Sequence, residues 1–292
     1  MSWSNRNMLE ALINPKRAEK APWKMLLVGL LYGSLSLILA HLFFTQDQVL
    51  SKFSGLIVVT FCVMFSLPFM YYIIKKEEKR DEVIEGFRDV WKVHKDAIYA
   101  LIWLFVGFVI AFSFWHIALH DHNLLNAQIE TYCSINYPSN VEDCVNQYSG
   151  GSSSSITGGI TKGSRLMLIL ENNVYVLIFT LIFSIIFGAG AIFILAWNAS
   201  VIAGAIGIFS EYQLSKIPLG VARYMLHGVP EIAAYFIAAL AGGILGVGII
   251  RNGFRGKRFY HVLENMILLI FLAISILIIA AIMEVYLTPA FF

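Results

Sequence analysis

His227 and Glu231 are four positions apart, just before a long apolar stretch at 232–250. An imidazole near a carboxylate could transfer protons or bind a metal ion. In an unbroken helix the two side chains would share one face and could reach one ligand. Pro230 disfavours a helical Val229. We therefore favour a helix that starts at Pro230, with Glu231 as a first-turn cap on the positive end of the helix dipole, and keep a functional site as the alternative.

Several other polar side chains fall within apolar stretches, where an ionisable group costs about 2.5–3.5 kcal/mol at the centre of a membrane helix. Glu284 is near a helix carboxyl end, where an acid opposes the dipole, so it needs a partner such as His227, Asn172 or Arg223. For Asn198 we favour hydrogen bonding between helices. The predicted intramembrane polar cluster consists of Glu171, Asn172, Asn173, Asn198, His227, Glu231 and Glu284.

The composition is that of an integral membrane protein. Of the 292 residues, 58% are hydrophobic and 14% are charged, and the mean hydropathy is +0.72. Soluble domains have about 45–50% apolar residues. The net charge of +2, without a basic patch interleaved with aromatics, gives no reason to expect a nucleic acid partner. The lipid bilayer is the expected environment, and we expect no cofactor.

Seven apolar stretches predict an all-α, polytopic bundle of transmembrane helices, at about 25–44, 54–74, 97–119, 166–187, 191–209, 231–250 and 262–287. The fourth and fifth form one run of about 44 residues, which as one helix would measure about 66 Å, roughly twice the hydrocarbon core. We place a break near Gly188 and Gly190. Six spans plus a re-entrant hairpin remain the alternative.

Basic residues cluster in 1–24, 75–95 and 251–258, and the positive-inside rule assigns all three clusters to the cytoplasm. This requires an even number of crossings between residues 96 and 251, as the four spans predicted there provide. The amino terminus is then cytoplasmic, while the carboxyl terminus and the segment 120–165 are extracytoplasmic. All members of the predicted cluster that can ionise then lie toward the outer leaflet.

We divide the chain into two parts. Residues 1–96 contain two transmembrane helices and a cytoplasmic amphipathic helix at 75–95, with charges of both signs outside. The alternative for 75–95 is a solvated extension of the second span. Residues 97–292 form a five-helix membrane core with the extracytoplasmic segment 120–165.

Cys133 and Cys144 share a polar segment, and we predict a disulfide between them, which fits an extracytoplasmic location. Cys62 lies in an apolar run and should pack as a small hydrophobe. The histidines at 116, 120 and 122 are close in sequence, but further ligands at suitable spacing are lacking, so we predict no metal site.

Glycines predict where helices approach one another. Gly242 and Gly246 are four residues apart in the sixth span, a spacing that lets two helix backbones come close. Gly188 and Gly190 belong to the break proposed above. These four glycines are the predicted helix-packing positions.

Several motifs in the second half carry a family resemblance. They are Glu171-Asn172-Asn173, the Gly188/Gly190 turn, Trp197-Asn198 followed by Gly204, His227-Gly228-Val229-Pro230-Glu231 with Gly242/Gly246, and Ile282-Met283-Glu284 before Thr288-Pro289. On these motifs, residues of about 97–290 resemble the archaeal-type integral membrane proteins of the stage II sporulation protein M family. Carried over by position, the matching residues are Asn173, Asn198, His227, Gly228, Glu231 and Glu284.

The resemblance implies a five-helix membrane core without recognised enzymatic activity, in a family whose sporulation member anchors a cell-wall-remodelling complex in the membrane. No phosphate-binding loop, nucleophile elbow or zinc-protease motif is found in the sequence. We therefore expect a non-catalytic scaffold that associates with other membrane proteins or with itself. The alternative is a transporter or channel with a cavity lined by Glu171, His227, Glu231 and Glu284. A membrane-embedded hydrolase using His227 and Glu231 is a third, weaker option.

Overall fold

The computed structural model describes residues 22–47, 49–81, 87–119, 121, 124–148, 161–187, 192–252 and 257–292. Within these ranges every regular element is helical, and seven of the helices are long and apolar enough to cross a membrane. The predicted fold class is confirmed. The chain is an all-helical, multi-pass membrane protein.

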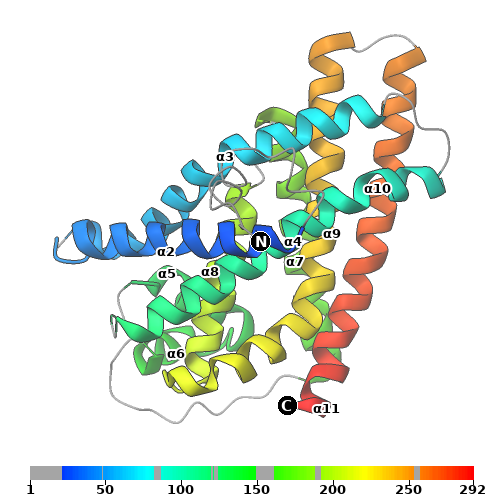
Figure 1. Ribbon diagram of the computed structural model, residues 1–292. Helices are drawn as coiled ribbons and strands as arrows, with labels where there is room; N and C mark the ends of the chain where they lie inside the picture. Colours follow the sequence, from blue (N-terminus) through cyan, green and yellow to red (C-terminus); the bar gives the residue numbers. More distant parts are fainter. Residues whose placement is uncertain are drawn as a thin grey trace, which may run out of the picture.

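The helices follow one another as the apolar pattern predicts (Figure 1). The first half contains α2 (Lys24–Phe44), the 3-10 turn η2 (Leu50–Phe53), α3 (Ser54–Asp81) and α4 (Phe87–Ala118). Two short helices, α5 (Asn126–Asn136) and α6 (Val141–Tyr148), come next. The second half contains α7 (Lys162–Phe187), α8 (Ile192–Phe209), η4 (Leu214–Lys216), α9 (Ile217–Asn252), α10 (Lys257–Ile282), the π-helical turn η5 (Met283–Leu287) and α11 (Thr288–Phe291).

The long apolar run at 166–209 forms two helices, as predicted. α7 ends at Phe187 and α8 begins at Ile192, and each is long and apolar enough to cross a bilayer. Gly188 and Gly190, the predicted site of the break, lie outside the described residues.

The predicted start of the sixth span is wrong. α9 begins at Ile217, and Pro230 lies inside this helix. A proline inside a helix removes one backbone hydrogen bond and bends the axis, but membrane helices tolerate it where neighbouring helices support the freed groups. Figure 1 shows α9 bending between its yellow first part and its orange last part.

The single amphipathic helix predicted at 75–95 is also wrong. α3 continues to Asp81, and α4 starts at Phe87. Nδ1 of His94 lies 2.7 Å from Oε2 of Glu77, whereas one straight helix would place residues 17 positions apart about 25 Å from each other. The chain therefore turns back between α3 and α4. The alternative holds only in part, because residues 75–81 extend the second span, whereas residues from 87 onward belong to α4 and Glu77 is buried rather than solvated.

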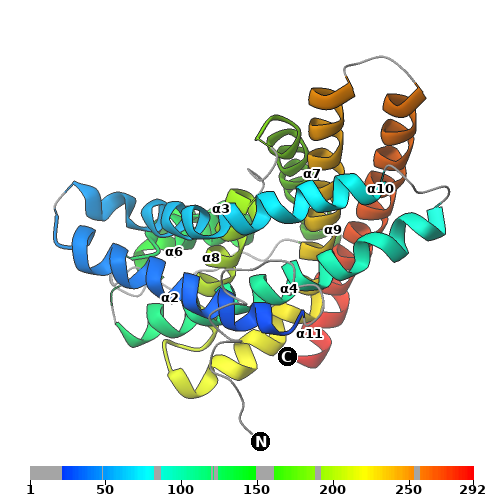
Figure 2. The ribbon, with the colours of Figure 1, turned by 45° about the horizontal axis from the view of Figure 1, so that its top comes forward.

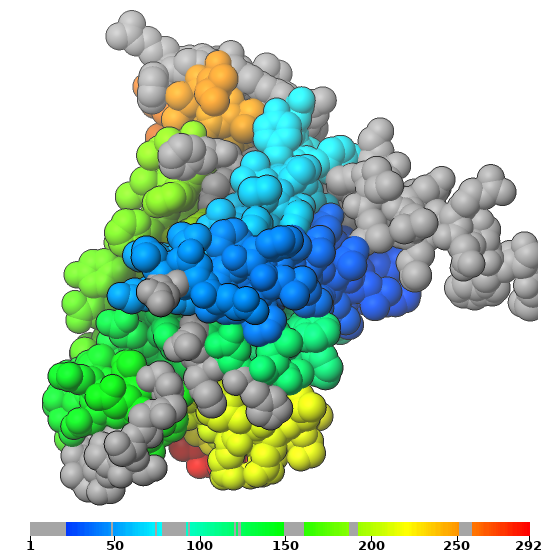
Figure 3. Space-filling model, turned by 90° about the vertical axis from the view of Figure 1, so that its left-hand side faces the viewer, coloured from blue at the N-terminus to red at the C-terminus, as the bar shows by residue number. Residues whose placement is uncertain are grey.

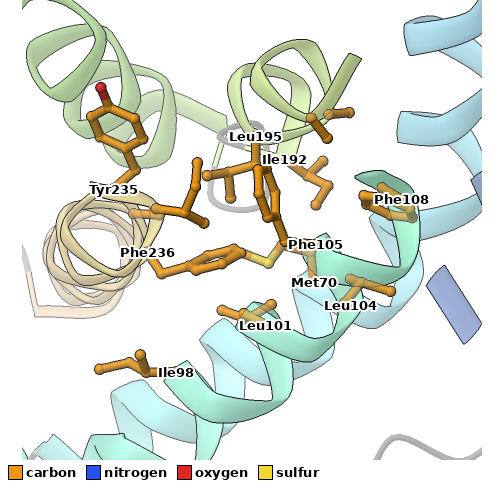
Figure 4. Close-up of a cluster of buried hydrophobic side chains, with 14 of the residues drawn as sticks. Met70, Ile98, Leu101, Leu104, Phe105, Phe108, Ile192, Leu195, Tyr235 and Phe236 are labelled. Atoms are coloured by element: carbon orange, nitrogen blue, oxygen red, sulfur yellow. The ribbon is translucent and has the colours of Figure 1, made fainter. Parts of the chain in front are cut away.

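α9 is the central helix of the bundle. In its most apolar window 83% of the residues are buried, compared with 22% for α7. The core beside α9 joins four helices, and Figure 4 shows Phe236 of α9 facing Phe105 of α4 beside Met70 of α3 and Leu195 of α8. The two phenylalanine rings are 6.5 Å apart in an edge-to-face arrangement, which is favourable for aromatic pairs.

Glycines allow close contacts in two places. Gly29 of α2 faces Gly107 of α4, and a Cβ on either glycine would clash with backbone of the other helix. Where α9 meets α7, a Cβ at Gly242 would lie 2.6 Å from the carbonyl oxygen of Leu181, and a Cβ at Gly246 would meet the carbonyl oxygen of Ile185. The sixth-span glycines thus lie at a close helix contact.

α5 and α6 form a cap against one end of the bundle, here called the α5–α6 cap. Cys133 and Cys144 lie at disulfide-bonding distance, with Cα atoms 5.7 Å apart. The hydroxyl of Tyr212, in the turn before α9, donates to the carbonyl of Tyr148 at 3.0 Å. Burial raises the pKa of Tyr212 to about 12.

Figure 2 gives a second view of the bundle. Figure 3 shows the green cap beside the yellow start of α9, below the blue α2.

Candidate functional site

A polar cavity of about 160 Å³ lies where the α5–α6 cap meets α7, α8, α9 and the end of α10. We call it the polar cavity. Its lining consists of Tyr132, Ile135 and Asn136 of α5, Arg165, Ile169, Asn172 and Asn173 of α7, Asn198, Val201, Ile202 and Ala205 of α8, Arg223, Tyr224, His227, Gly228 and Glu231 of α9, and Glu284, Thr288 and Pro289 at the end of the chain.

Helical spacing explains how each helix contributes one face. On α9, Arg223, His227 and Glu231 follow each other at intervals of four residues, which places them on the same side. On α7, Arg165 and Asn172 are seven residues apart, and this spacing again keeps both side chains on one face. The cavity forms where these polar faces meet.

The lining also fixes the directions of the helices. The cavity contacts the amino-terminal parts of α7 and α9, the middle of α8 and the end of α10. α7 and α9 therefore start at the same end of the bundle, where α10 ends. The chain must return to this end between α7 and α9, as separate crossings by α7 and α8 require.

The interpretation of Glu231 as a helix cap is wrong. It lies fourteen residues beyond the first residue of α9, far from the helix amino end. Because α9 continues through Pro230, Glu231 and His227 line the same cavity, as they would in an unbroken helix. The hydroxyl of Tyr235 donates to Oε1 of Glu231 at 3.0 Å, which fixes the carboxylate from within the same helix.

His227 connects α9 to the end of the chain. Its Nδ1 lies 3.0 Å from Oγ1 of Thr288, and both residues are buried. His227 is one of the three partners predicted for Glu284, but its hydrogen bond goes to Thr288 instead. Glu284 lies in the π-helical turn η5 and faces the cavity. Such turns are rare and often occur at functional sites.

The three predicted asparagines all line the cavity. Nδ2 of Asn172 donates to Oδ1 of Asn173 at 3.3 Å, while Nδ2 of Asn198 donates to the carbonyl of Ile194 at 2.7 Å. The amide donor of Asn198 therefore bonds within its own helix rather than between helices as expected. Nδ2 of Asn173 is buried, and no hydrogen-bond partner for it occurs among the described residues.

The structure does not bring Glu171 to the other members of the predicted cluster. Its side chain is exposed on α7, and it does not line the polar cavity. The neighbouring Asn172 and Asn173 do, because successive residues of a helix point about 100° apart. Six of the seven predicted residues thus share the cavity.

Residues 98–289 match the model of the family described as Stage II sporulation protein M. The chain belongs to the stage II sporulation protein M family. No curated protein and no solved structure significantly matches the chain.

The region of the stage II sporulation protein M family begins within α4 and ends in α11. It therefore includes every residue that lines the polar cavity, while α2 and α3 lie before it. The cavity is a feature of the family region of this chain rather than of its first two spans.

Sequence reasoning left Arg165, Tyr132 and Tyr224 out of the site. The signal for Arg165 was its position seven residues before Asn172, on the same helix face. Nothing in the sequence brings Tyr132 to the cavity, because this depends on how the α5–α6 cap packs. For Arg223 the sequence suggests only a role as a partner for Glu284.

A second buried pair was not predicted at all. Glu77 of α3 and His94 of α4 are hydrogen bonded at 2.7 Å, and both side chains are fully buried. We call them the sealed pair. A single amphipathic helix at 75–95 would keep these two residues far apart, so the sequence pattern does not predict their contact.

The polar cavity places two arginines, two glutamates, a histidine and four asparagines around one small space. Such a set of ionisable and amide groups can bind a small polar molecule by electrostatic attraction and by hydrogen bonds. Within the described ranges, no group of three His, Cys, Asp or Glu side chains could hold a metal ion.

Proposed function

We propose that this protein is a non-catalytic membrane scaffold that holds other membrane proteins, or further copies of itself, together in the bilayer. Membership of the stage II sporulation protein M family supports this role. The observation that carries it is the large exposed side of α7. Only 22% of the residues in the most apolar window of this helix are buried.

The exposed face of α7 is a continuous apolar stripe. Tyr175, Phe179, Ile182 and Ile186 are all exposed and recur at intervals of four, three and four residues. This spacing places them on one side of the helix. A stripe of this kind can pack against a transmembrane helix of a partner, with lipid as the alternative neighbour.

Photo-crosslinking from this stripe tests the proposal. A photoreactive amino acid at Phe179 should give specific protein–protein adducts in intact cells. Phe271 of α10 is 70% exposed and serves as a control for general exposure. Lipid adducts alone at position 179, in cells and in the purified protein, would contradict the scaffold.

The polar cavity favours a second candidate function, a transporter. Three of the four residues predicted to line a transport cavity, His227, Glu231 and Glu284, do line this one. Further along α9, the apolar contact between Phe236 and Phe105 fills the centre of the bundle. A transporter would have to open this contact in another conformation.

Solute uptake into liposomes that contain the purified protein tests transport. A transporter predicts flux that Glu284→Gln abolishes and that Glu171→Gln leaves intact, since Glu171 is exposed outside the cavity. Absence of flux with a wide set of small polar solutes would count against this function.

We also propose the orientation given by the basic clusters, with the amino terminus in the cytoplasm and the α5–α6 cap outside. A disulfide between Cys133 and Cys144 supports the outer location of the cap, because such bonds persist in oxidising compartments. A variant with an engineered cysteine at Ser215, in η4, should react with an impermeant reagent on intact cells.

The intact mass of the alkylated wild-type protein tests the disulfide. Before reduction it should show one free thiol, from Cys62, and three free thiols would refute the disulfide.

A further inference from the structure

Basic and acidic side chains face the same polar cavity without bonding to each other. Arg165 and Arg223 supply positive charge, and Glu231 and Glu284 supply carboxylates. In the part of the chain that the structure describes, no ion pair joins either arginine to either glutamate. Charged groups in a membrane protein usually pair with each other or face a functional cavity, so these four have room for a ligand between them.

Other contacts hold the two arginines in place. Nη2 of Arg165 donates to Oδ1 of Asn136 at 3.1 Å. The guanidinium carbon of Arg223 lies 4.7 Å from the ring centre of Phe209, a cation–π contact that leaves the edge of the guanidinium available for hydrogen bonds. Both arginines are therefore oriented, and among the residues that the structure describes neither guanidinium forms an ion pair with a carboxylate.

The charges are also ordered along the cavity. Arg223 and Glu231 are eight residues apart on α9, which corresponds to about 12 Å along the axis. Arg223 is nearer the amino end of α9, and Arg165 is exposed near the amino end of α7. The arginines thus mark the mouth, and the carboxylate of Glu231 lies deeper in the bundle.

Asn173 gives an independent indication of a ligand. Its side chain is only 4% exposed and lines the cavity. The hydrogen bond from Asn172 occupies its oxygen, and Nδ2 finds no partner among the described residues. A buried donor without a partner is costly. An acceptor atom of a bound molecule would satisfy it.

The space suits a small molecule. A volume of about 160 Å³ equals that of roughly five water molecules at about 30 Å³ each. We propose that the polar cavity binds a small zwitterion, with its phosphate or carboxylate at Arg165 and Arg223 and its ammonium group at Glu231 and Glu284. The ligand is either a free solute or the headgroup of a membrane lipid. This inference does not depend on whether the protein is a scaffold or a transporter.

Binding of O-phosphoethanolamine to the full chain in phosphatidylglycerol nanodiscs tests the proposal for a free solute. Isothermal titration should show saturable binding, at least tenfold tighter than that of inorganic phosphate or ethanolamine alone. Glu284→Gln and Arg223→Gln should each weaken binding at least tenfold. Glu171→Gln is the matched control, because it removes an exposed carboxylate of α7 outside the cavity, and it should bind like the wild type.

A second arm tests the lipid headgroup. In nanodiscs that contain equal amounts of phosphatidylethanolamine and phosphatidylglycerol, native mass spectrometry should retain phosphatidylethanolamine on the wild type and lose it from Glu284→Gln. Variants are compared only if they keep the unfolding temperature of the wild type, and Arg165→Gln at the exposed mouth replaces Arg223→Gln if the latter misfolds.

Retention of the lipid with weak binding of the free solute assigns the site to the headgroup, and the reverse assigns it to a solute. The proposal is overturned if the Glu284→Gln and arginine variants bind both probes, O-phosphoethanolamine and phosphatidylethanolamine, as tightly as the wild type does. Equal binding of phosphate alone and O-phosphoethanolamine would also overturn it, because the carboxylates would then play no part.

Discussion

Two groups of acidic and imidazole side chains lie at opposite ends of the helix bundle, and they are built differently. At the end where α3 leads to α4, Glu77 and His94 bond directly to each other at 2.7 Å with no exposed surface. At the other end, His227, Glu231 and Glu284 surround a cavity, and the imidazole bonds to Thr288 rather than to a carboxylate.

The difference separates a structural role from a binding role. In the sealed pair the imidazole and the carboxylate bond directly to each other, which fixes α3 against α4. In the polar cavity the carboxylates and arginines are left apart, so a ligand can complete the site. Glutamate and histidine thus have a structural role where they bond to each other, and a binding role where they line a common cavity.

The largest expected effect is at the sealed pair. His94→Ala should lower the free energy of unfolding by about 3–5 kcal/mol, because it removes the imidazole that bonds to a fully buried carboxylate. Reversible unfolding in bicelles measures this change. The double variant Glu77→Leu/His94→Leu should recover most of the loss, since apolar groups of similar size often replace a buried pair without cost. A loss below about 1 kcal/mol for His94→Ala would contradict the structural role.

Next in size is the close contact between α9 and α7. Gly246→Val should destabilise the protein by about 1–3 kcal/mol, because the added carbons meet the backbone oxygen of Ile185 and force the helices apart. Gly163→Ala is the control, since no atom lies within 4 Å of its added Cβ. Equal unfolding temperatures for the two variants would show that the contact is looser than described.

A smaller effect is expected where the α5–α6 cap joins the bundle. Tyr212→Phe removes the hydrogen bond to Tyr148 and should cost about 1 kcal/mol. Burial raises the pKa of Tyr212 from 10.0 to about 12 in the folded protein. The stability from the neutral hydroxyl is therefore complete below pH 10 and is lost as the pH rises from about 10 to about 12. The phenylalanine variant should not show this part of the pH dependence, as unfolding curves across that range can check.

The smallest effect on stability is expected in the polar cavity. Glu284→Gln keeps the size of the side chain and should change the free energy of unfolding by less than about 0.5 kcal/mol. The same substitution in the sealed pair, Glu77→Gln, is the matched comparison and should cost more, because its partner is fully buried. Equal losses at both positions would remove the distinction between the two ends.

Much of the fold could be predicted, because the length of an apolar stretch in the sequence directly indicates a membrane span. Seven spans and the break between α7 and α8 followed from the roughly 30 Å thickness of the hydrocarbon core. The two errors came from local rules. Pro230 suggested the start of a helix but lies inside α9, and the mixed charges at 75–95 suggested one helix but belong to two. At Pro230 the packing of neighbouring helices outweighed the local preference.

The sequence by itself determined that this is a helical membrane protein of the stage II sporulation protein M family and which polar residues lie in its membrane helices. Only the tertiary structure decided which of them meet. Glu171 and Asn172 are neighbours in sequence, yet only Asn172 faces the cavity, and Glu77 meets His94 across 17 positions. The physical reason is that apolar length sets where a helix crosses, whereas side-chain partners depend on the rotation of each helix and on packing between helices.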